Sequence, residues 1–142
     1  MNVEVILKEK GGDIISISPS ASVSDAAALL SGRKIGALVV TDGTSLSGIL
    51  SERDIVRAIV SDGAAALGEP VSHFMTENVV TCSRDDTTLR LMDLMTGGRF
   101  RHLPVVEEGQ VIGLISIGDV VKARISETEM EAEQLKMYIA SG

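Results

Sequence analysis

The sequence predicts an α+β fold built from two similar halves, each with the order strand, helix, strand, strand, helix. The main basis is an internal repeat: Gly-Arg at positions 32–33 recurs 66 residues later at 98–99, and Val-Val at 39–40 recurs at 105–106. Beyond the next glycine turn the spacing is 65 residues, so the one length change falls in a turn, where chains tolerate it. A duplicated unit usually forms a pseudo-twofold pair, and the groove between its halves is a natural ligand site.

Composition and charge restrict the possible functions. The 142 residues are 44% hydrophobic but include only one Tyr, two Phe and no Trp, so the core must be aliphatic. The net charge of −7 argues against nucleic acid as a partner, because phosphate backbones bind to basic surfaces. No apolar run approaches a membrane span, and the first residues lack the pattern of a signal peptide. We therefore expect a cytoplasmic protein with no membrane partner, whose single cysteine, Cys82, is a buried thiol.

Each half shows the same order of local signals. A short extended segment leads into a helix that follows a Ser or Thr cap and is expected to stop at glycine. A β-hairpin with a glycine in its turn comes next, and a second helix opens at a Ser-x-x-Asp segment. In the two halves the expected ranges are 13–19 and 78–83 for the extended segments, 23–30 and 89–95 for the first helices, 37–40 with 46–50 and 103–106 with 111–115 for the hairpins, and helices ending near 60 and 125.

The end of the chain predicts a separate helix. Ser126 with Glu129 matches a capping box, and Leu135, Tyr138 and Ile139 share one apolar stripe. This stripe could pack on its own domain or form a dimer contact, and the sequence favours neither. The predicted division of the chain is a first repeat at 6–62, a linker at 63–72, a second repeat at 73–127 and a C-terminal helix at 128–142.

The best candidate site residues lie where each second helix is predicted to begin. Ser51 precedes Asp54 by three residues, and Ser116 precedes Asp119 in the same way. Such a pair can cap a helix, because the first backbone N–H groups of a helix are unpaired. The carboxylate can equally accept both hydroxyls of a vicinal diol such as a ribose. Either role suits one copy of the pattern, and its recurrence at related positions favours a ligand.

A basic cluster precedes the second strand of the second half. Although the chain is acidic, one stretch of four residues contains three potential cations, Arg99, Arg101 and His102. The first half has Arg53 directly before Asp54. The cluster could be solvated charge at a strand entry, or it could hold one anion. Since Gly118 stands in the second copy where Arg53 stands in the first, the two sites should differ in ligand or affinity.

Motifs of catalysis are missing from the sequence. It contains no Gly-x-Gly-x-x-Gly, Walker or Gly-x-Ser-x-Gly segment. Its two histidines, His73 and His102, lie far apart, and a zinc site would need more Cys and His than the chain contains. We therefore expect neither an enzyme nor a metal protein.

The repeat unit closely resembles the CBS domain, named for cystathionine beta-synthase. The resemblance rests on IGALVV (35–40) with GILSERD (48–54), and on RHLPVV (101–106) with GLISIGD (113–119). It covers about residues 6–127, and two such repeats form the pair often called a Bateman module. The stretch from Met95 to Ile125 and the C-terminal helix are similar to those of small stand-alone bacterial proteins of this type.

The resemblance implies a cleft that binds an adenine nucleotide, with AMP or NAD(H) as the first expectation and ATP or S-adenosylmethionine as family alternatives. By analogy the site residues would be Asp54, Asp119, Ser51 and Ser116 for the ribose, Arg99, Arg101, His102 and Arg53 for the phosphate, and Ile15, Ser16, Val80 and Thr81 for the adenine. The first copy departs from the family pattern before its hairpin, where it has Ile35 and Gly36, and Arg53 is the candidate substitute for the missing phosphate contact.

The predicted function is a non-catalytic regulatory module that senses energy or redox state and acts on an unknown downstream protein, most simply as a homodimer. Two alternatives belong to other classes. One is a structural dimeric adaptor with empty clefts. The other is a regulatory fragment of a nucleotide-metabolising enzyme, although the chain lacks the roughly 250 residues of a catalytic barrel.

Overall fold

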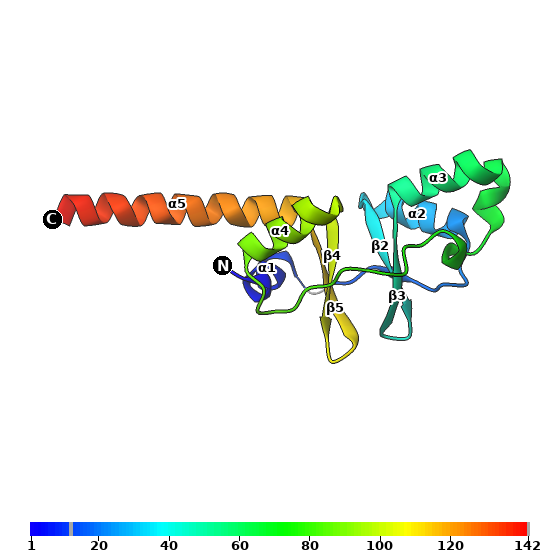
Figure 1. Cartoon of the computed structure of the whole chain (residues 1–142), viewed down its shortest axis with the longest axis horizontal. Coiled ribbons are helices and arrows are strands. Elements are labelled where there is room, and N and C mark those ends of the chain that lie inside the picture. Colours follow the sequence, from blue (N-terminus) through cyan, green and yellow to red (C-terminus); the bar gives the residue numbers. More distant parts are fainter. Residues whose placement is uncertain (12, 142) are drawn as a thin grey trace.

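The computed structural model describes residues 1–11 and 13–141. Its centre is a five-stranded sheet of order β1-β2-β3-β5-β4, in which two antiparallel hairpins lie next to each other (Figure 1). The hairpins meet edge to edge near their turns, where Ser45 pairs with Gln110. The strands are β1 (Ser16–Ile17), β2 (Ala37–Asp42), β3 (Ser45–Ser51), β4 (His102–Glu107) and β5 (Gln110–Ser116).

The helices form two groups, one beside each hairpin. Helices α2 and α3 lie beside β2 and β3, whereas α1, α4 and α5 lie beside β4 and β5 (Figure 1). The helices are α1 (Val3–Lys10), α2 (Val23–Arg33), α3 (Glu52–Asp62), α4 (Thr88–Gly98) and α5 (Ile117–Ser141), with short 3₁₀ helices η1 (Gly63–Gly68) and η2 (Val71–His73) between the halves. This arrangement confirms the predicted α+β fold of two repeats packed through their sheets. Within the described ranges, none of the helices combines the length and apolar character of a membrane span.

Each half has its own aliphatic core, as the composition predicts. In the first half, Leu38 and Leu50 of the hairpin pack with Leu30 of α2. In the second half, Leu103 and Ile115 pack with residues of α4, α5 and α1. Because each core is enclosed by its own helices, the space between the halves remains available for a site.

The two halves exchange short segments. Val3 and Ile6 of α1, at the start of the chain, are buried in the core of the second half. Val71 of η2, which follows the first half, is buried in the core of that first half. The segment that follows η2 lies against β3, and at Gly48 an added Cβ would come within 2.6 Å of the carbonyl oxygen of Thr76. Glycine is therefore needed at this position for the close approach.

The second half lacks a regular first strand where residues 78–83 are expected to be extended. Only Cys82 forms a bridge, with Val105. Its N–H donates to the carbonyl of Pro104 at 3.0 Å, and its carbonyl accepts from the N–H of Val106 at 3.0 Å. An earlier bond of this ladder would need an N–H on Pro104, which proline does not have. The first half differs at the later end of the ladder, where Ile17 pairs with Val40 beyond the Ser16–Val39 pair that corresponds to the Cys82 bridge.

The predicted helix ends need two corrections. Helix α5 continues as one helix through Ser126, so the expected cap does not form. Arg124 instead bonds Glu127 at 3.0 Å within the helix, and every residue from 128 to 141 is exposed. The apolar stripe therefore does not pack on its own domain. Helix α2 also passes Gly32 and ends at Arg33, whereas α4 ends at Gly98 as expected. The residues that follow these helices, Lys34 and Arg99, are in left-handed conformation, at φ of 54° and 56°.

Candidate functional site

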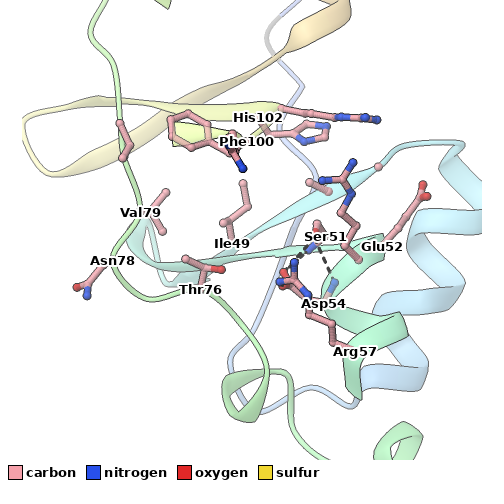
Figure 2. Close-up of a pocket in the computed structure, with 16 residues that line it drawn as sticks. Ile49, Ser51, Glu52, Asp54, Arg57, Thr76, Asn78, Val79, Phe100 and His102 are labelled. Atoms are coloured by element: carbon pink, nitrogen blue, oxygen red, sulfur yellow. Dashed lines mark hydrogen bonds and ion pairs between the residues drawn. The ribbon is translucent and has the colours of Figure 1, made fainter. Parts of the chain in front are cut away.

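A cavity of about 390 Å³ lies where the two halves meet, and we call it the first cleft. The first half contributes β2, β3 and the start of α3, and the second half contributes residues 99–101 ahead of β4 and His102, the first residue of β4. Residues 76–80, which connect the halves, complete its wall. Figure 2 shows Asp54 and Arg57 on one side of this cleft and Phe100 and His102 on the other.

Asp54 is fixed in the wall of the first cleft by a reciprocal pair of contacts with Ser51. The backbone N–H and the hydroxyl of Ser51 donate to Oδ2 of Asp54 at 2.8 and 3.1 Å, and the N–H of Asp54 donates to the serine hydroxyl at 3.3 Å. The second oxygen, Oδ1, lies 3.6 Å from the Arg57 guanidinium. The residue is only 9% exposed. Capping therefore occupies one carboxylate oxygen and leaves the other for a ligand.

Positive charge gathers in the first cleft despite the acidic composition of the chain. Four guanidinium groups line it, those of Arg53, Arg57, Arg99 and Arg101, against two carboxylates. Two of these arginines come from α3 and two from the segment before β4, so the halves contribute equally. Guanidinium groups bind phosphate with paired hydrogen bonds, so the cleft suits an anion.

The remaining wall of the first cleft is largely apolar. Ile49 of β3, Val79 and Val80 of the connecting segment and Phe100 form this part. Apolar side chains around a few fixed polar groups are typical of sites that bind small organic molecules. A planar base could lie against these side chains while a diol and a phosphate reach the charged residues.

His102 lies between the first cleft and a second cavity of about 300 Å³. Burial lowers the pKa of its imidazole, and the positive charges of Lys10 and Arg101 lower it further, although Asp119 and Glu52 act in the opposite direction. The ring is therefore neutral near pH 7. It can form a hydrogen bond to an anion, but the arginines provide the charge.

We call this second cavity the second cleft. Its lining includes the carboxylate of Asp13, while Asp119 lies beside the cleft in contact with two lining residues, Lys10 and Ser116. Asp119 accepts from the N–H and hydroxyl of Ser116 at 2.8 and 2.9 Å, as its counterpart does in the first half. In addition, the ammonium of Lys10 donates to Oδ2 of Asp119 at 2.7 Å. Partial burial alone would raise the pKa of Asp119, but the hydrogen bonds from Lys10 and Ser116 hold it below its ordinary value. This carboxylate is therefore charged and paired.

The structure brings most of the residues expected for a site to the two clefts. Ser51, Arg53, Asp54, Val80, Arg99, Arg101 and His102 line the first cleft, while Ile15, Ser116 and His102 line the second. Asp119 lies beside the second cleft under Lys10. In the described part of the chain, Ser16 and Thr81 belong to neither lining, since Ser16 pairs with Val39 in the sheet and Thr81 precedes the Cys82 bridge.

Several lining residues were missed by sequence reasoning. Arg57 could have been found, because a residue three positions after Asp54 lies on the same helix face. Thr76, Asn78 and Phe100 lie in irregular segments, where no periodicity indicates which side chain faces a cavity.

Two similar α+β repeats with a cleft between them define a tandem-repeat module with a candidate ligand site. The family model of the CBS domain matches residues 8–61 and again 71–126, and the chain belongs to this family. The resemblance inferred from the repeat is therefore confirmed.

Similar proteins include curated sequences and solved structures. The mitochondrial CBS domain-containing protein CBSX3 of Arabidopsis thaliana is 36% identical over 146 residues, which cover 96% of this chain and 71% of that protein. The crystal structure of the CBS-domain containing protein ATU1752 from Agrobacterium tumefaciens is 51% identical with a TM-score of 0.84, covering 87% of this chain and 99% of that one. CBSX2 in complex with AMP is 26% identical with a TM-score of 0.76, covering 89% and 98%.

Proposed function

We propose that this chain is a non-catalytic regulatory module of the cytoplasm that binds an adenine nucleotide in the first cleft. The observation that carries the proposal is the meeting of a fixed carboxylate, Asp54, with four arginines in one cavity between the halves. The similar protein CBSX2, which has been solved with AMP, supports the choice of ligand.

Each part of a nucleotide has a partner in the first cleft. The free oxygen of Asp54 would accept the ribose hydroxyls, as carboxylates do in dinucleotide sites. The base would lie among Val80, Phe100 and their apolar neighbours. The phosphate would bind Arg99 and Arg101, with Arg53 as a further cation from the first half.

The size of the cleft favours a mononucleotide. Its volume of about 390 Å³ lies near the lower end of the range for small-molecule sites, which is about 300–1,000 Å³. AMP is therefore preferred over NAD(H), which carries a second nucleotide, while ATP and S-adenosylmethionine are the competing ligands of the titration.

A signal could arise because the ligand contacts both halves. Binding would stabilise one relative arrangement of α3 and the segment before β4, and a downstream protein that prefers this arrangement would respond. We further propose a homodimer, because α3 and α5 leave apolar residues exposed, among them Val60 at 82% and Ile125 at 55%.

The test is titration calorimetry on nucleotide-stripped protein with AMP, ATP, NAD⁺, NADH and S-adenosylmethionine. Asp54→Asn is the informative variant, since the amide oxygen can still accept from Ser51 while the charge is lost. We expect AMP to bind the wild type and binding to fall at least tenfold in this variant. If none of the five ligands binds, the dimeric adaptor without a ligand becomes the better account. If any ligand is converted to product, the module is not simply regulatory.

A further inference from the structure

The two clefts differ at the aspartate of the Ser-x-x-Asp pattern: Asp54 lines the first cleft, whereas Asp119 lies behind Lys10 and Ser116, which line the second cleft together with Asp13. Asp54 and Asp119 are held by their serines with nearly the same distances, 2.8 and 3.1 Å against 2.8 and 2.9 Å. Only Asp119 has a lysine ammonium on the same oxygen, at 2.7 Å. The partner of Asp54, Arg57, is 77% exposed in its side chain and stands 3.6 Å away.

Lys10 holds this position with two contacts. Besides the carboxylate, its ammonium donates to the carbonyl of Leu114 at 2.6 Å. With the repeat spacing of 65 residues, Leu114 corresponds to Ile49 in the first half, whose carbonyl accepts from the backbone N–H of Thr76 at 2.9 Å. The same acceptor is thus satisfied by the main chain in one half and by a side chain in the other. In the second half, the ammonium that donates to this carbonyl also donates to the carboxylate of Asp119.

The lysine reaches this place because of the segment exchange. Lys10 is the last residue of α1, whose Val3 and Ile6 are buried in the core of the second half. Helix α1 is thereby fixed against the second half, and the ammonium needs no movement of the backbone to stay in place. The Lys10 side chain is 36% exposed, so the ammonium remains within reach of a competing group.

We propose that Lys10 acts as an internal ligand of Asp119 that keeps the second cleft closed to nucleotides. A ribose would have to displace the ammonium from the carboxylate before its hydroxyls could bind there. Displacement leaves both the ammonium and the Leu114 carbonyl without these partners, and hydrogen bonds to charged groups are the strong ones. The chain therefore binds one nucleotide, in the first cleft, and removal of Lys10 opens a second site. This inference rests on the proposed function, because it concerns the same ligand.

The experiment compares AMP binding by wild type, Lys10→Met and Lys10→Arg, with the number of sites measured by calorimetry and by native mass spectrometry. Methionine retains much of the apolar length of the side chain but has no charge, and arginine is the matched control that keeps the charge. We expect one site per chain in the wild type and in Lys10→Arg, and two in Lys10→Met. Thermal unfolding establishes that each variant is folded.

Two further variants assign the sites. Asp54→Asn should remove the wild-type site, whereas Asp119→Asn should leave it intact. In Lys10→Met the added site should be lost when Asp119→Asn is introduced as well. One site in folded Lys10→Met overturns the closure of the second cleft alone, and so does a wild type with two sites. Binding that requires Asp119 but not Asp54 in Lys10→Met overturns the proposed role of the first cleft instead. Absence of AMP binding in every variant overturns both.

Discussion

The contact between Ser51 and Asp54 allows a quantitative prediction, because it joins helix stability to the candidate site. In Ser51→Ala the helix α3 loses its cap, since the hydroxyl no longer accepts from the N–H of Asp54. Loss of such a cap costs about 1 kcal/mol. The carboxylate of Asp54, only 9% exposed, also loses a bond of 3.1 Å, and a bond to a charged group contributes roughly 1.5 kcal/mol or more. Together these losses amount to about 2–3 kcal/mol in the free energy of unfolding.

The second half provides a matched comparison. Ser116→Ala removes the corresponding contacts, but Asp119 keeps its bond from Lys10 at 2.7 Å. We therefore expect Ser116→Ala to cost less than Ser51→Ala, about 1–2 kcal/mol. Ser51→Thr keeps the hydroxyl and should restore most of the stability.

The assay is thermal unfolding followed by circular dichroism, without nucleotide. For a chain of this size, about 1 kcal/mol corresponds to roughly 2–4 °C in Tm, so Ser51→Ala should unfold about 5–10 °C below the wild type. A shift smaller than about 1 °C, or a larger loss in Ser116→Ala than in Ser51→Ala, would refute the reasoning.

Three other predictions concern the core and the titrating groups. Leu91→Ala should cost about 2–5 kcal/mol in stability, because Leu91 is fully buried, while Leu89→Ala, at 56% exposure, should change Tm little in the same melting experiment. The pKa of Asp119 is lowered in the folded state, so its charge stabilises the fold above the ordinary pKa, and this contribution is lost as the pH falls through the folded value. Urea unfolding at several pH values should therefore show Asp119→Asn less stable than wild type near pH 7 and the difference disappearing in acid, whereas a constant difference would contradict this origin. Burial raises the pKa of the Cys82 thiol to about 12, so a thiol reagent at pH 8 should label the unfolded chain and leave the native protein unlabelled.

The repeat in the sequence was sufficient to predict the fold and much of the first cleft. The pairing of residues across the halves was not predicted: Arg101 was assigned to the copy of Asp119, and Arg53 was the phosphate contact expected beside Asp54, whereas the structure places Asp54 and Arg101 in one cleft. Local signals worked where one element decides the outcome: the Ser or Thr cap expected before the first helix of each half forms, at Ser22 for α2 and at Thr87 for α4.

The missed features depend on contacts between distant parts of the chain. Lys10 gives no local sign of its bond to Asp119, because that bond follows from the packing of α1 on the other half. The capping pattern at Ser126 was misleading, since the same residues also suit the interior of a helix that already has a start at Ile117.

The exchange of segments between the halves has a consequence for the integrity of the protein. The connection between them includes η1, most of whose residues are exposed, and a protease could cleave there. The fragment before the cut would carry α1, which is buried in the other fragment's core, and the fragment after it would carry Val71, which is buried in the first. The two fragments would therefore stay associated through these buried residues after the peptide bond is cleaved. The same interlocking makes the chain a candidate for reassembly from two separately expressed fragments, with nucleotide binding as the sign that they have joined.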